Sequence, residues 1–110
     1  MSELLLKQQA FARAAASLIV HADFLKLPVT VGDAFRDPRL FGAMGTEKGY
    51  GQKNSCHKLR LAIDLNLVID GKLAAPDAYA PLHDYWETIG GSKRISDDMN
   101  HFSFEHNGFR

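Results

Sequence analysis

The chain has 110 residues, a length typical of one compact domain, and about 45% of its residues are hydrophobic, which is enough for a sizeable core. Its 13 basic residues balance 13 acidic ones, which argues against a broad basic surface for nucleic acid or an anionic membrane. A single cysteine, Cys56, excludes an intramolecular disulfide.

The apolar segment 14–22 resembles the core of a signal peptide, but ionisable residues interrupt the region and its apolar positions follow a helical pattern. No stretch approaches the roughly 20 apolar residues that cross a bilayer. We therefore expect a protein that is made in the cytoplasm and is not inserted in a membrane. It would reach a substrate outside the inner membrane only when another component releases it. We also expect it to be a monomer. The interrupting residues are Glu3, Lys7, Arg13 and His21.

Apolar residues at helical intervals predict a first helix from about Ser2, its N-cap, to about Lys26, where Pro28 ends it. The β-branched run 29–31 predicts a short strand, and the glycine-rich segment 42–54 predicts an exposed, mobile loop. The expected buried positions of the helix are Leu4, Phe11, Ala15, Leu18, Ala22 and Leu25.

The segment 61–69 is the clearest strand, because apolar residues alternate along it. Asp70-Gly71 then predicts a tight turn between antiparallel strands. The apolar face comprises Leu61, Ile63, Leu65, Leu67 and Ile69, and the opposite face comprises Ala62, Asp64, Asn66 and Val68.

Pro76-Asp77 predicts the start of a second helix and Gly90-Gly91 its end, and the alternation near Phe102 predicts a final strand within 95–104. The buried helix face is expected to hold Tyr79, Leu82, Tyr85, Trp86 and Ile89. These elements predict an α+β fold in one domain, residues 1–110: a small, mostly antiparallel sheet with two main helices packed on it.

Asp64 is an ionisable residue on a strand otherwise committed to hydrophobic packing. His57 lies just before that strand, where the loop can fold back toward Asp64, and His101 lies on the predicted last strand. Two imidazoles and a carboxylate suit a metal site whose fourth position stays open for water. Asp98 precedes His101 by three residues, a spacing that places a carboxylate beside the metal as a general base. Without a metal, Asp64 would cap or hydrogen-bond a nearby loop.

The order Ser55-x-His57, Ala62-x-Asp64 and Asp98-x-x-His101-Phe102 resembles the zinc peptidoglycan peptidases. This family includes D-alanyl-D-alanine carboxypeptidases and the L-alanyl-D-glutamate endopeptidases that bacteriophages use as endolysins. The resemblance spans most of the chain, and it implies one zinc ion held by His57, Asp64 and His101, with Asp98 as catalytic base.

The resemblance also implies that Arg36 stabilises the oxyanion or grips the substrate carbonyl. Ser55 and Tyr50 are candidates for substrate binding, although Ser55 can equally shape its loop and Tyr50 can face solvent. The chain departs from the family at Arg60, where glycine is usual, and its acid Asp98 is an aspartate, as in the phage endopeptidases.

We therefore expect an endolysin-type L-alanyl-D-glutamate endopeptidase that acts on peptidoglycan stem peptides and waits for a holin to open the membrane. The alternatives are a D-alanyl-D-alanine carboxypeptidase and a catalytically silent, zinc-stabilised wall-binding module. A metal-dependent nuclease based on His101 and His106 is disfavoured by the neutral charge.

The remaining histidines, His21, His83 and His106, are expected to be surface or hydrogen-bonded residues. Cys56 beside His57 could suggest a thiol nucleophile, but an extended segment would point the two side chains apart, so an inert, semi-buried thiol is expected.

Overall fold

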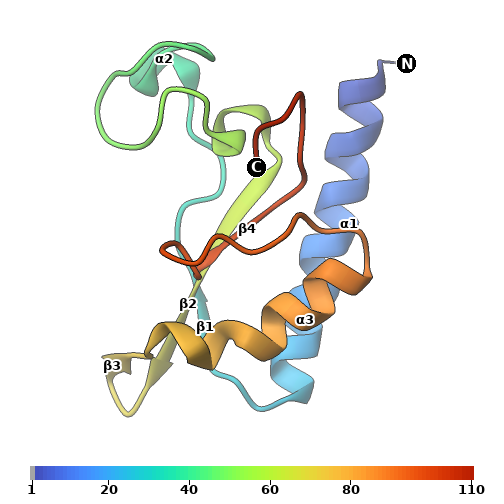
Figure 1. Cartoon of the computed structure of the whole chain (residues 1–110), viewed down its shortest axis with the longest axis vertical. Coiled ribbons are helices and arrows are strands. Elements are labelled where there is room, and N and C mark those ends of the chain that lie inside the picture. Colours follow the sequence, from blue (N-terminus) through green and yellow to red (C-terminus); the bar gives the residue numbers. More distant parts are fainter. Residues whose placement is uncertain (1) are drawn as a thin grey trace.

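The computed structural model describes residues 2–110, and the α+β fold predicted from the sequence is confirmed (Figure 1). Within that range, no helix is both long and apolar enough to traverse a lipid bilayer. The elements in chain order are α1 (Glu3–Phe24), β1 (Val29–Val31), α2 (Pro38–Phe41), the 3-10 helix η1 (Cys56–Leu59), β2 (Ala62–Ile69), β3 (Lys72–Leu73), the 3-10 helix η2 (Pro76–Tyr79), α3 (Ala80–Thr88) and β4 (His101–Ser103).

Helix α1 begins and ends with specific capping contacts. The Ser2 hydroxyl accepts a hydrogen bond from the Leu5 N–H at 3.1 Å, which confirms Ser2 as the N-cap. The helix ends at Phe24, slightly earlier than predicted, because Lys26 adopts a left-handed conformation with φ 58°. The N–H groups of Lys26 and Leu27 then donate back to carbonyls of the last turn, which is a Schellman motif.

Strand β2 is the centre of the sheet, because β1, β3 and β4 all pair with it in antiparallel fashion. The β2–β3 hairpin turns through Asp70 and Gly71, both with positive φ, as the Asp-Gly signal predicts. In Figure 1, α1 runs alongside the sheet and α3 crosses α1, whereas α2 and the loop after it lie at the opposite end of the view from β3.

The core lies between the apolar face of β2 and the two main helices. Leu65 and Leu67 are fully buried on that face, as predicted. Trp86 of α3 contacts Phe11 of α1 edge-on at 5.8 Å between ring centroids, and its indole N–H donates to the Ser103 carbonyl at 3.0 Å. This aromatic packing joins α1, α3 and β4 and leaves the other face of β2 for polar residues.

Three residues predicted to be buried, Leu25, Ile69 and Ile89, are instead more than a third exposed. Each lies at or just beyond the end of its element, where the facing layer no longer covers it. One further local feature differs from the prediction. Residues 76–79, predicted as the start of the second helix, form a 3-10 turn before α3.

Arg60 links η1 to β2 in a left-handed conformation, φ 58° and ψ 34°. This conformation favours glycine, so Arg60 keeps the turn that a glycine at this position would make. Its guanidinium lies over the Phe35 ring, 4.0 Å from the centroid. The strained backbone of Arg60 therefore lowers the stability of the fold, whereas the stacking contact raises it.

We expect Arg60→Gly to be more stable than Arg60→Ala by about 1 kcal/mol, because both variants lose the stacking contact and only glycine relieves the strain. The free energies of unfolding can be measured in urea by the fluorescence of Trp86, the only tryptophan. An alanine variant at least as stable as the glycine variant would contradict a strained turn.

Candidate metal centre

The register of β2 and β4 places Asp64 directly opposite His101. Directly opposed residues of an antiparallel pair project from the same face, so the two side chains meet on the face away from the helices. The distance from His101 Nδ1 to Asp64 Oδ1 is 3.5 Å. Phe102, the next residue of β4, projects to the other face and is fully buried in the core.

His57 reaches the same carboxylate because the chain before β2 folds into a 3-10 turn, not the extended segment expected. The Ser55 hydroxyl caps this turn by accepting from the His57 N–H at 3.2 Å, and Arg60 reverses the chain into β2. His57 Nε2 lies 3.2 Å from Asp64 Oδ1, and the other ring nitrogen, Nδ1, lies 2.7 Å from the Ala34 carbonyl. With a proton on Nδ1, that contact leaves the Nε2 lone pair for a metal.

Two of the three distances between the donor atoms match the spacing of a tetrahedral metal site. Two ligands that are each ~2.0–2.1 Å from a tetrahedral centre lie ~3.4 Å apart. The two distances to Asp64 Oδ1, 3.2 and 3.5 Å, agree with this value, and all three donor atoms lie within 4.8 Å of one another. The group of His57, Asp64 and His101 can therefore hold a metal ion.

The imidazoles also set the charge of Asp64. Burial alone raises the pKa of this carboxyl, but hydrogen bonds and charge from His101 and His57 outweigh burial and lower the pKa well below its ordinary range. In the folded protein at neutral pH, Asp64 is therefore ionised.

Gly32, the residue after β1, lies close to Asp64: a Cβ at Gly32 would be 3.2 Å from the Asp64 Cβ.

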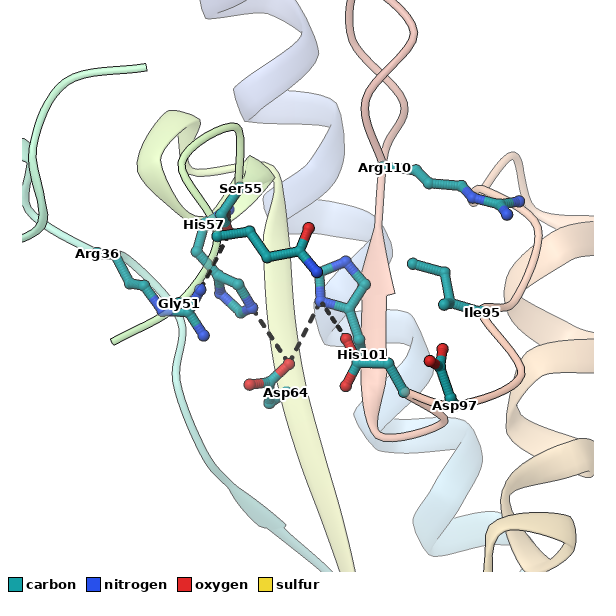
Figure 2. Close-up of a pocket in the computed structure, with 11 residues that line it drawn as sticks. Arg36, Gly51, Ser55, His57, Asp64, Ile95, Asp97, His101 and Arg110 are labelled. Carbon is teal, nitrogen blue, oxygen red and sulfur yellow. Dashed lines mark hydrogen bonds and ion pairs between the residues drawn. The ribbon is translucent and has the colours of Figure 1, made fainter. Parts of the chain in front are cut away.

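The three side chains form the floor of a cavity of about 330 Å³. Figure 2 shows His57 and His101 pointing at Asp64 from either side, with Arg36 beyond His57 and Arg110 beyond His101. Asp98 lines the same cavity and is 52% exposed, and its Oδ2 lies 4.0 Å from His101 Nδ1. The cavity walls are formed by Arg36, Gly51, Gln52, Ser55, Ile95, Asp97, Asp98 and Arg110.

Arg36 is held in place at the cavity wall by two side chains. Its Nε donates to Asp33 at 3.2 Å, and its Nη1 donates to the Ser55 hydroxyl at 3.1 Å. Ser55 thus shapes the turn and also lines the cavity, and its contact with substrate stays a prediction. Tyr50 is 61% exposed and is absent from the cavity lining, and its ring lies 5.4 Å from the Arg36 guanidinium.

None of the other three histidines lines the cavity. His21 stacks on Tyr85 with 3.9 Å between centroids, and His106 Nδ1 lies 3.0 Å from the ammonium of a lysine on α1. His83 is fully buried and packs its ring on Phe102, and its Nε2 donates to a carbonyl in the loop before β4. His83 and His106 therefore make polar contacts, as expected, whereas His21 is half-buried against an aromatic ring.

Cys56 is fully buried rather than semi-buried, and it faces the hydrophobic core. Burial, with a smaller effect of the Glu105 charge, raises the pKa of its thiol from an ordinary value of 9.0 to about 11. A neutral thiol in the core is a poor nucleophile at neutral pH, which supports the inert role predicted for it.

Four residues of the site were not predicted from the sequence: Asp33, Asp97, Gly51 and Arg110. Asp33 precedes Arg36 by three residues and Asp97 adjoins Asp98, so both could have been found from spacing to a residue already chosen. Gly51 and Arg110 carry no such signal, because they reach the cavity only through the path of the loop and of the chain after β4.

No protein-family model matches the chain, and a search of curated proteins finds no match. The chemistry of the site is therefore inferred from the geometry of its own residues.

We expect a divalent transition-metal ion to raise the free energy of unfolding by about 2.7 kcal/mol at a free concentration 100 times its Kd. His57→Ala and His101→Ala should abolish this stabilisation, because each removes one of three ligands, whereas His106→Ala should retain it. Isothermal titration and thermal unfolding with and without a chelator measure both effects. Equal metal affinity in all three variants would exclude this site.

We expect the stability advantage of the wild type over Cys56→Ala to shrink as pH rises from about 9 to about 11. The unfolded thiol ionises near pH 9 while the buried thiol keeps its proton to about 11, so stability present below pH 9 is lost across this window. The loss should be on the order of 1–2 kcal/mol. Urea unfolding of both proteins at several pH values measures the gap, and a constant gap would contradict the raised pKa.

Proposed function

We propose that this chain is a zinc-dependent peptidase that cleaves the L-alanyl-D-glutamate bond of peptidoglycan stem peptides. The observation that carries the proposal is the convergence of donor atoms of His57, Asp64 and His101, all within 4.8 Å of one another, on the floor of an open cavity. That convergence is what a catalytic metal needs: three protein ligands and one face open to solvent.

Zinc is the proposed metal because of the donor set. Two imidazole nitrogens and one carboxylate oxygen suit Zn²⁺, which prefers tetrahedral sites, whereas Mg²⁺ and Ca²⁺ prefer six or more oxygen ligands. When bound, zinc would polarise the scissile carbonyl and lower the pKa of a water to ~7.

Two residues of the cavity supply the rest of the proposed chemistry. Asp98 is exposed to the cavity and close to His101, so its carboxylate can accept a proton from the attacking water and deliver it to the leaving amine. Arg36 keeps further N–H groups after its contacts with Asp33 and Ser55, and these can donate to the oxyanion of the tetrahedral intermediate.

The substrate class rests on the motif resemblance, and the cavity is compatible with it. A surface cavity of this size admits a short segment of peptide, and the arginines at its sides can bind carboxylates of an acidic stem peptide. In this proposal, the protein is an endolysin that is released to the cell wall through a holin-dependent opening of the membrane.

The test is to digest purified peptidoglycan with the zinc-loaded protein and identify the new termini by mass spectrometry. Free L-alanine carboxyl ends are expected. Release of D-alanine alone would assign the protein as a D-alanyl-D-alanine carboxypeptidase. Binding to the wall without any product would identify a silent wall-binding module and exclude the proposed peptidase.

Asp97 and Asp98 provide a matched pair for testing the general base. We expect Asp98→Asn to lower kcat at least ~100-fold, because it removes the proton acceptor, and to leave zinc affinity unchanged. Asp97→Asn removes the same charge from the same cavity and should retain most activity. Steady-state kinetics and zinc titration of both variants make the comparison. An Asp98→Asn enzyme as active as Asp97→Asn would exclude Asp98 as the base.

A further inference from the structure

Lys58 is a buried cation with no carboxylate partner. Lys58 directly follows His57 of the metal site in η1, and Lys58 is only 5% exposed. Among residues 2–110, no ion pair includes Lys58. A buried charge without compensation is costly, so the surroundings of its ammonium group must stabilise it.

Three backbone carbonyls provide this stabilisation. The Lys58 Nζ donates to the carbonyl oxygens of Thr46 at 2.6 Å, Lys53 at 3.1 Å and Ala43 at 3.4 Å. An ammonium group has three N–H donors, so the three carbonyls satisfy it completely. We call this arrangement of Lys58 and the three carbonyls the ammonium cage.

All three carbonyls of the ammonium cage belong to the glycine-rich 42–54 loop, which contains no helix or strand. Ala43 and Thr46 lie near its start and Lys53 near its end, so a single side chain ties both ends of the loop together. The Gly45 N–H also donates to the Lys53 carbonyl at 2.9 Å, which reinforces the same closure. The loop is therefore organised around the cation, although its composition predicts mobility.

The same loop forms one wall of the cavity above the metal centre. Gly51 and Gln52 line the cavity. Gly51 has φ +91°, and a Cβ at this residue would lie 2.6 Å from the Arg36 Nη1, so the loop packs directly on that guanidinium. Figure 2 shows Gly51 beside Arg36, on the His57 side of the cavity. Any outward movement of the loop would open this wall.

We propose that Lys58 is a positioning residue that holds the 42–54 loop in place as the substrate-binding wall of the cavity. This inference rests on the proposed peptidase function for the identity of the substrate. Lys58 acts through the loop and not on the reacting atoms, so its loss should weaken substrate binding while the metal ligands and Asp98 stay in place.

The first test compares Lys58→Met with Lys72→Met. Methionine keeps most of the buried volume and removes the charge, whereas Lys72 is an exposed lysine on β3. Lys48 and Lys53 make the loop a target for trypsin. With zinc bound, native Lys58→Met should be cut in the loop at least ~10-fold faster than the wild type or Lys72→Met, because the loop opens locally. Equal cleavage rates in all three proteins would overturn the proposal.

The second test separates substrate binding from catalysis on an L-alanyl-D-glutamyl peptide. Lys58→Met should raise KM about 10-fold, with kcat within about 3-fold of the wild type and zinc affinity unchanged. A joint fall of kcat and zinc affinity would show that Lys58 merely supports the metal centre, which contradicts a loop-positioning role. Failure of the wild type to cleave any peptide would defeat the proposed function and leave the trypsin result to decide the role of Lys58.

The third test needs no variant, so it applies even if Lys58→Met does not fold. Reductive methylation of the native wild type should modify the exposed Lys48 and Lys72 and leave Lys58 unmodified, because the ammonium cage occupies all of its N–H groups. Peptide mass spectrometry after denaturation and digestion locates the methyl groups. Methylation of Lys58 as rapid as that of Lys48 would show that the cage is absent.

Discussion

The antiparallel pairing of β2 with β4 is the constraint on which the metal centre depends. This pairing sets Asp64 across from His101, two residues that are far apart in the chain. A register shift of one residue would turn His101 toward the core and Phe102 toward the cavity. Fully buried Phe102, packed among the aromatic residues of the core, therefore stabilises the same register that brings the two ligands together.

The two faces of β2 divide stability from chemistry. One face buries Leu65 and Leu67 under the helices, and the other carries Asp64 beside the cavity. This division explains how a carboxylate is tolerated on a central strand: it is half-buried, lies within 3.5 Å of a nitrogen of each of two imidazoles, and stays ionised. A bound metal ion would be coordinated by these two nitrogens and the Asp64 oxygen, so metal binding would also stabilise the fold.

The cavity wall depends on irregular backbone that is held by polar side chains. Asp33 and Ser55 orient Arg36, and Lys58 gathers the loop that packs against it. None of these polar contacts involves the apolar core, so a substitution in the wall can leave the sheet undisturbed. The cavity wall and the group of residues that can hold a metal ion are thus positioned by different contacts.

The sequence determined the elements and the candidate ligands, because both leave local signals. Helical and alternating patterns located α1, β2 and α3, and an aspartate on an apolar strand indicated the candidate metal site before any fold was known. Tertiary structure alone decided which side chains meet. The β2–β4 register, the left-handed turn at Arg60 and the burial of Lys58 arise from contacts between distant segments, and local sequence patterns do not encode them. Lys58 is the clearest example. A lysine side chain is usually exposed, and only the carbonyls of the folded loop make the burial of Lys58 possible.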